Sequence, residues 1–180
     1  MRTKWLWVVA LAGVAAGCGE GHAIFNVDVY SFIKGTGRDT IPYFVPPGPP
    51  ASASTFQRID LPGAGSSFVD SVIVNGKMSL ENQAGTGSIG LQLFIAADSA
   101  GTLNSTALAL TVPDAAVSGT AVTPDTIVGR FNDAVIQLFT GSQLWIRLQA
   151  KGTNSGVILL QGKAVIKSLW LTVVINDKLF

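Results

Sequence analysis

Apolar and polar residues alternate with a period of two along much of this 180-residue chain. The clearest runs lie at 72–80, 89–95 and 143–150. Successive side chains of a β-strand point to opposite faces, whereas an α-helix repeats its apolar positions every three or four residues. The pattern therefore predicts strands that each bury one face, and it argues against a helical fold.

The runs 72–80 and 89–95 are joined by a short loop that contains glycine. Two alternating runs with such a connection predict a β-hairpin. The loop overlaps Gly85–Gly90, whose sequence fits the dinucleotide-binding pattern G-x-G-x-x-G. That pattern holds a pyrophosphate where it follows a strand and opens a helix. Here it opens an alternating strand, and we interpret it as a hairpin turn.

The last segment, 157–175, has the composition of a strand over its whole length but changes parity near Ser168. Ala164 and Ile166 share one parity, whereas four later apolar residues take the opposite one: Leu169, Leu171, Val173 and Ile175. One extra residue in a strand moves every later side chain to the other face. We therefore expect a bulge, or a crossing between sheets, near Ser168.

Shorter runs predict four further strands, at 24–33, 55–61, 108–112 and 127–131. Apolar spacings of three and four before Gly141 predict a single helical turn, which Asn132 or Asp133 caps. Glycine is plentiful, and the strong helix formers glutamate and lysine are scarce. That balance favours strands and tight turns.

Five of the eight prolines lie in the ten residues 41–50. Proline lacks a backbone N–H and is excluded from helix interiors and inner strands. We therefore expect 42–54 to be a proline-rich surface loop. Tyr43 and Phe44 lie in this loop, where they are candidate binding residues or pin the loop to the core.

The N-terminus has the parts of a secretory signal peptide. Two basic residues in 1–4 precede the apolar run 5–14, and small residues follow as far as Gly17. The apolar run is about half the roughly 20 residues that a membrane-spanning helix needs. The sequence therefore predicts export, not a transmembrane anchor.

The motif Val14-Ala15-Ala16-Gly17-Cys18 resembles the lipobox of bacterial lipoproteins. The resemblance covers the first eighteen residues, and Ala15 stands where that family more often has leucine. It implies that the chain is cut before Cys18 and that this cysteine is diacylated on sulfur. Two or more acyl chains hold a protein stably on a membrane. The alternative is an ordinary signal peptide with an incidental cysteine.

The same resemblance divides the start of the chain into a signal peptide at 1–17 and a lipid-anchored spacer at 18–23. In enterobacterial lipoproteins an aspartate directly after the cysteine favours retention at the inner membrane. Gly19 occupies that position here, so the resemblance favours the outer membrane over the inner membrane. The expected address is the bacterial cell envelope.

The mature chain is long enough for one hydrophobic core, so we expect a single domain at 24–180. About eight short strands, with turns roughly every ten residues, predict an all-β fold. The expected architecture is an antiparallel β-sandwich with at most one short helix, after an N-terminal signal helix. A small closed barrel is the alternative.

The chain has little material for catalysis. Its only histidine is His22 and its only cysteine is Cys18, both outside the predicted domain. A Ser-His-Asp triad, a Cys-His pair or a structural zinc site cannot be assembled from this set. We expect no enzyme, no cofactor and no metal ion. The alternative, a hydrolase with two facing carboxylates, would have to draw on acids that are scattered over turns.

Charge excludes one class of partner. Removal of 1–17 leaves ten of the twelve basic residues against eleven acidic ones, without a basic cluster. Nucleic-acid binding needs clustered lysine and arginine, so no nucleic-acid partner is expected.

Trp145 and Arg147 share the polar parity of the run 143–150. A tryptophan on such a face stacks on sugars or anchors an interface, unless both faces of the strand are buried. We expect a lipid-anchored β-sandwich with a non-enzymatic binding or structural role in the envelope, and an envelope protein or a glycan as partner. The alternative is a carbohydrate-binding or adhesion module on the cell surface.

Overall fold

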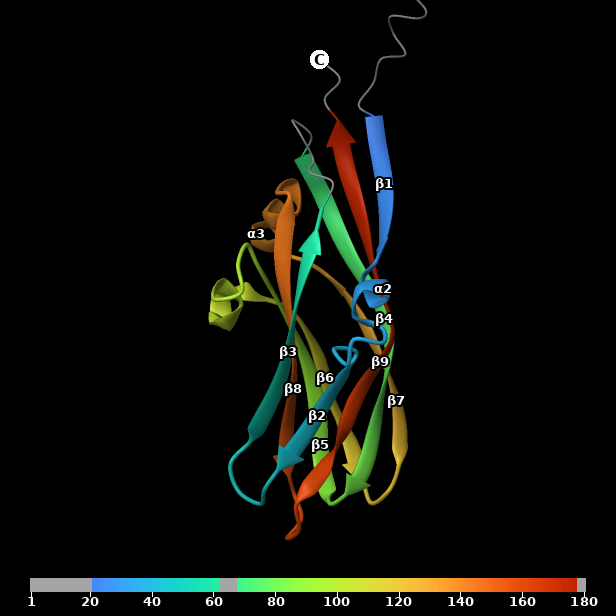
Figure 1. Ribbon diagram of the computed structural model, residues 1–180, viewed down its shortest axis with the longest axis vertical. Coiled ribbons are helices and arrows are strands. Elements are labelled where there is room, and N and C mark those ends of the chain that lie inside the picture. Colours follow the sequence, from blue (N-terminus) through green and yellow to red (C-terminus); the bar gives the residue numbers. More distant parts are fainter. Residues whose placement is uncertain (1–20, 62–67, 178–180) are drawn as a thin grey trace, which may run out of the picture.

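The computed structural model describes residues 21–61 and 68–177 (Figure 1). The predicted signal peptide and Cys18 lie outside the described residues. Nine strands are present in the described part of the chain: β1 Gly21–Asp28, β2 Thr40–Val45, β3 Ala51–Asp60, β4 Phe68–Ala84, β5 Thr86–Ala96, β6 Leu108–Ser118, β7 Val122–Arg130, β8 Gln143–Asn154 and β9 Leu160–Asp177. The helices are short: α2 Val29–Ile33, η1 Gly101–Leu103, η2 Ser105–Ala107, α3 Asp133–Ile136 and η3 Gln137–Thr140.

The strands form two sheets, and every pair of neighbours is antiparallel. Sheet A has the order β1-β9-β4-β7, and β2 also pairs with β9. Sheet B has the order β3-β8-β5-β6. β1 and β2 pair with successive halves of the same edge of β9, at 170–177 and 160–165. Together they act as one interrupted edge strand.

The pairing is nested along the chain. β2 pairs with β9, β3 with β8, β4 with β7 and β5 with β6. The chain therefore runs as one long hairpin that is folded over itself. From β2 to β9 each strand lies in the other sheet from the strand before it, except that β5 and β6 pair with each other in sheet B. Two sheets connected in this way form a jelly roll, an antiparallel β-sandwich, in which β1 and β2 of the five-stranded sheet A share one edge position. The predicted fold class is confirmed, and the two separate sheets rule out the closed barrel.

The core lies between the inner faces of the two sheets. The predicted alternation of β8 is confirmed, because Leu144, Ile146, Leu148 and Ala150 are all buried. Removing a buried leucine side chain from such a core typically costs about 2–5 kcal/mol. Packing of this kind holds together a described chain that has no cysteine.

The bulge predicted near Ser168 is also confirmed. β4 pairs Lys77 with Ser168 and the next residue, Met78, with Ile166, which leaves Lys167 as the extra residue of β9. Ile166 and Leu169 are both buried although their parities differ. One residue therefore keeps both halves of this long strand facing the core.

The predicted hairpin at 72–95 is wrong. β4 belongs to sheet A and β5 belongs to sheet B, and the two strands cross from one sheet to the other at Gly85. Gly85 has a φ of +80°, a conformation that residues with a Cβ rarely adopt. Alternation identifies the buried face of each strand but not its partner, and both sheets of a sandwich give the same pattern.

The observed strand β1 starts three residues before the predicted strand at 24–33 and ends five residues before it. β1 ends at Asp28, whose side chain accepts a hydrogen bond from the backbone N–H of Ser31 at 3.2 Å and starts α2. The four-residue spacing of the buried residues Val29 and Ile33 fits a helical turn as well as a strand. At its start β1 takes in 21–23, including His22, which the prediction gave to the spacer.

The predicted proline-rich loop at 42–54 is only partly a loop. β2 takes 40–45 and β3 begins at Ala51, so the irregular segment is 46–50. Pro42 is tolerated because β2 lies at an edge and pairs with β9 alone in the described sheets. The predicted helical turn is confirmed as α3, where the Asn132 side chain accepts a hydrogen bond from the N–H of Val135 at 3.0 Å.

Candidate functional site

Tyr43 and Phe44 point to opposite sides of β2. Tyr43 is buried in the core, and its hydroxyl donates to Oδ1 of Asn82 at 3.1 Å. Phe44 is 62% exposed. The structure therefore places Tyr43 among the core residues, away from any surface site, because β2 continues the alternation of Ile41 and Val45 through it.

Burial raises the pKa of Tyr43 to about 12. Between pH 10 and about 12 the unfolded chain loses this proton while the folded chain keeps it. The free energy of unfolding is therefore expected to fall as pH rises through that window. Chemical denaturation at pH 9 and pH 11 checks this, and Tyr43→Phe should reduce the difference between the two values. An unchanged difference in that variant would show that another group titrates.

Trp145 and Arg147 both lie on the outer face of sheet B, as their shared parity predicts. Arg147 faces Phe56 of β3 on one side and Phe94 of β5 on the other. Trp145 lies one row away, opposite Arg58, and is half-buried. It is neither a fully exposed platform nor a core residue.

Arg147 is held tightly in this face. Its guanidinium carbon lies 3.7 Å from the centroid of the Phe94 ring, and its Nε donates to the carbonyl of Thr102 at 2.9 Å. Nη1 donates to Oε1 of Gln149 at 2.8 Å. Burial lowers the pKa of Arg147, but a guanidinium stays charged in proteins. Arg147 is thus a positioning residue that fixes the neighbouring amide.

Gln149 and Gln92 face each other across β8 and β5. Because Gln149 accepts from Arg147 through its oxygen, its amide hydrogens are left to donate. Among the described residues neither glutamine nitrogen donates to another protein atom. The pair borders an open hollow of about 260 Å³, which is lined by Pro50, Ala51, Ser52, Gln92, Gln149 and Lys151.

Phe56 completes this surface and was not singled out in the sequence. It lies on β3 in the row next to the glutamine pair, opposite Arg147, and the residue is 36% exposed. Its outward parity, shared with Ser54 and Arg58, was the signal that could have found it. We call Ser52, Phe56, Gln92, Gln149 and Lys151 the glutamine face.

The glutamine face has the chemistry of a binding surface. Its amides and hydroxyl both donate and accept hydrogen bonds, the lysine adds a cation, and the exposed ring offers an apolar plane. The side chains that line the hollow include no carboxylate and no imidazole. Such a set can hold a ligand rich in hydroxyl groups.

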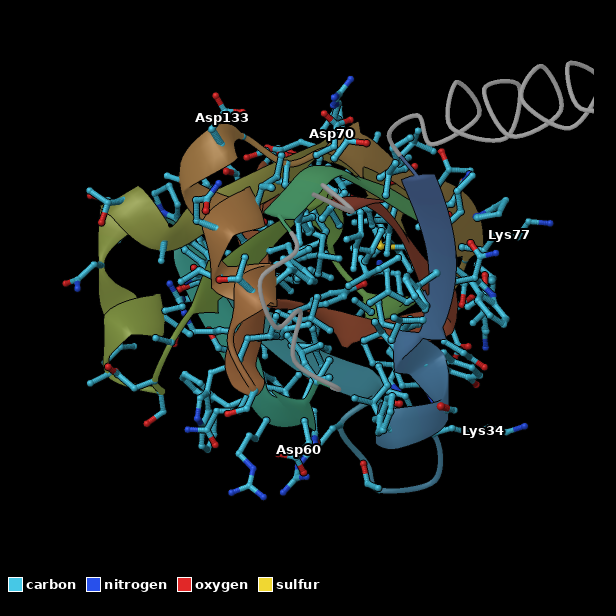
Figure 2. The ribbon with its side chains drawn as sticks, turned by 90° about the horizontal axis from the view of Figure 1, so that it is seen from above. Lys34, Asp60, Asp70, Lys77 and Asp133 are labelled. Atoms are coloured by element: carbon cyan, nitrogen blue, oxygen red, sulfur yellow. The ribbon has the colours of Figure 1, made fainter. Side chains whose placement is uncertain are left out.

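A second hollow, of about 600 Å³, lies on the outer face of sheet A beside the bulge of β9. It is lined by Lys77, Met78, Ser79, Pro124, Asp125, Thr126 and Lys167. Lys77 projects away from the body of the domain (Figure 2). Lys167 lies 3.2 Å from Glu81, which also pairs with Lys163 at 3.1 Å. Hydrogen bonds from Lys163 and Lys167 lower the pKa of Glu81.

Within residues 21–61 and 68–177, no three or more His, Cys, Asp and Glu side chains are grouped closely enough to hold a metal ion. No helix in them has the length and apolar character needed to cross a membrane.

No protein-family model and no curated protein matches the sequence. Among solved structures, the fold is similar to that of the infectious bursal disease virus VP2 subviral particle, with a TM-score of 0.52, 9% identity and coverage of 87% of this chain and 37% of the viral chain. The T13 particle of the same virus gives a TM-score of 0.52, 10% identity and coverage of 87% and 35%. The chain thus spans about a third of the viral chains that it matches, and the likeness shows the fold alone.

The module TmCBM61 in complex with β-1,4-galactotriose is a more distant neighbour. It has a TM-score of 0.32 and 10% identity, with coverage of 82% of this chain and 86% of that chain. A likeness this low carries no functional weight.

Proposed function

We propose that the protein is a lipid-anchored jelly-roll domain of the bacterial envelope that binds a glycan on its glutamine face and has no enzymatic activity. The observation that carries this proposal is the pair of facing amides beside the open hollow, Gln92 and Gln149, of which Gln149 is held by Arg147. Envelope glycans present dense, directional hydroxyl groups, which amide side chains bind as donors and acceptors. A glycan that stacks on Phe56 would reach both amides.

The fixed geometry favours binding. Gln149 is held by Arg147, which in turn is held by Phe94 and Thr102, so little side-chain freedom is lost when a ligand is bound. Lys151 is the only charged side chain among those that line the hollow. We therefore expect acidic glycans to bind more tightly than neutral ones of the same length.

A glycan screen tests the binding proposal. The wild-type protein should bind at least one envelope polysaccharide, and Gln92→Ala combined with Gln149→Ala should weaken that binding by about tenfold or more, because several hydrogen bonds are lost. Gln143→Ala is the matched control, since Gln143 is an exposed glutamine on the same strand and face. Equal losses in both variants would contradict the assignment.

The anchor is tested separately. Cys18→Ser removes the sulfur that the acyl chains need, so the protein is expected to move from the membrane fraction to the soluble fraction after cell lysis. Immunoblotting of the two fractions measures this, with the wild-type protein as the control. Retention of Cys18→Ser in the membrane fraction would contradict a lipid anchor on this residue.

A further inference from the structure

The end of the sandwich opposite Gly21 carries no charge in its connections. Four connections meet there: 46–50 between β2 and β3, Gly85 between β4 and β5, 119–121 between β6 and β7, and 155–159 between β8 and β9 (Figure 1). They consist of proline, glycine, serine, threonine, alanine and aliphatic residues. We call these four connections the distal end.

Three consecutive aliphatic side chains stand exposed at the distal end. Val157 is 93% exposed, Ile158 59% and Leu159 40%. Pro46 and Pro47, across from them in the β2–β3 connection, are exposed as well. Exposed apolar groups that are clustered in this way mark sites of contact with a protein or a membrane.

Two buried asparagines bind the backbone of the distal end from inside. The Asn154 amide donates to the carbonyls of Val45 at 2.8 Å and Ile158 at 2.7 Å, and its Oδ1 accepts from the N–H of Gly156 at 2.8 Å. The Asn82 amide lies 2.7 Å from the carbonyl of Gly119 and 3.2 Å from that of Gly85. Four backbone groups of the connections are thus bonded from inside, while the side chains of Val157, Ile158 and Leu159 face solvent.

This combination fits a lipid bilayer better than a protein surface. A stable protein interface buries about 800 Å² on each partner and has a polar rim. The distal end has no charged residue in its connections, and its apex, which is our name for the exposed run 157–159, is entirely aliphatic. Entry into a bilayer requires that backbone polar groups be bonded internally and that charges be absent.

We propose that the distal end inserts Val157, Ile158 and Leu159 into the surface of a phospholipid bilayer. β9 runs for 18 residues from Leu160, at the distal end, to Asp177, which pairs with Gly21. At about 3.3 Å per residue, the two ends of this strand are separated by roughly 55–60 Å. Cys18 lies three residues before Gly21, which is at the opposite end of the domain from the distal end. If Cys18 carries the proposed lipid anchor, on which this step rests, the two ends of the domain contact two different membranes.

A two-vesicle capture assay tests the inference. Full-length protein is incorporated through its N-terminal end into sucrose-loaded phosphatidylcholine vesicles, and protein-free fluorescent phosphatidylcholine vesicles are added. The wild-type protein should carry the fluorescent vesicles into the pellet. Ile158→Asp should reduce capture by about tenfold or more, because it places a charge at the apex. Val128→Asp is the control, since Val128 is 61% exposed on sheet A.

The outcomes separate the inference from the proposed anchor. If the protein does not enter the sucrose-loaded vesicles, the proposed anchor has failed. The free protein is then mixed with the fluorescent vesicles alone, and its flotation with them tests the distal end without the anchor. No capture by loaded wild-type vesicles, or equal capture by wild type and Ile158→Asp, would overturn the inference. Self-association in light scattering that Ile158→Asp abolishes, without vesicle binding, would assign the apex to a second copy and would also overturn it.

Discussion

Replacing Gly85 by alanine is expected to lower the free energy of unfolding by about 3 kcal/mol or more. The positive φ of Gly85 is unfavourable for a residue with a Cβ by roughly 1–2 kcal/mol. A Cβ at this position would also lie 2.6 Å from the carbonyl oxygen of Leu159 and 2.6 Å from Cα of Leu160. Both are backbone atoms, so β9 must shift, and overpacking of this kind costs about 1–3 kcal/mol more.

Denaturation by urea, followed by tryptophan fluorescence, measures the effect. Gly37→Ala is the matched control: Gly37 has a φ of +77°, and no atom lies within 4 Å of a Cβ built on it. Gly37→Ala should lower the free energy of unfolding only by the cost of a positive φ, about 1–2 kcal/mol. If Gly85→Ala and Gly37→Ala lower the free energy of unfolding equally, the close approach of Gly85 to Leu159 and Leu160 does not contribute to the need for glycine at this crossing.

Asn82→Ala is expected to lower the free energy of unfolding by about 3 kcal/mol. The Asn82 side chain accepts from the Tyr43 hydroxyl at 3.1 Å, and its two amide hydrogens serve the carbonyls of Ala84, Gly85 and Gly119. A buried polar group that loses its partner costs roughly 1–3 kcal/mol. Because the substitution removes several partners at once, we expect a loss above that of a single hydrogen bond.

The same denaturation measurement tests this second prediction. Asn75→Ala is the control, since Asn75 lies exposed on the outer face of the same strand and should change stability by no more than about 0.5 kcal/mol. Asn82→Ala should also weaken capture in the vesicle assay. A variant that is as stable as the control would show that water replaces these bonds and that the distal end is not fixed from inside.

Much of the fold follows from local pattern. The buried face of β8 and the bulge of β9 were both predicted, because parity depends on the residues of one strand alone. The cap of α3 was predicted for a similar reason, since Asn132 and the helix it caps are neighbours in sequence.

Strand pairing could not be predicted in this way. β4 and β5 are successive alternating strands with a glycine between them, yet they lie in opposite sheets. Partner choice depends on the nested contacts of β4 with β9 and of β5 with β8, which are distant in sequence. Tyr43 was assigned to a loop and not to a strand because the prolines around it concealed the alternation of β2, and its burial agrees with the alternative that it contacts the core.

In the candidate site, too, the direction of side chains could be predicted from the sequence, whereas the neighbours across strands could not. The outward direction of Trp145 and Arg147 was predicted from parity, and both lie on the outer face of sheet B. The contribution of Gln92 could not be predicted, because it comes from the pairing of β5 with β8. The glutamine face therefore appears only when three strands are placed side by side.

The most direct test of the account is the location of the bound glycan. In a nuclear magnetic resonance titration with the tightest glycan from the screen, the side-chain amide signals of Gln92 and Gln149 should shift, together with the backbone signals of Lys151 and Ser52. Signals from the hollow of sheet A around Lys77 should stay unchanged. Shifts confined to sheet A, or no shift with any glycan, would contradict the assignment of the glutamine face.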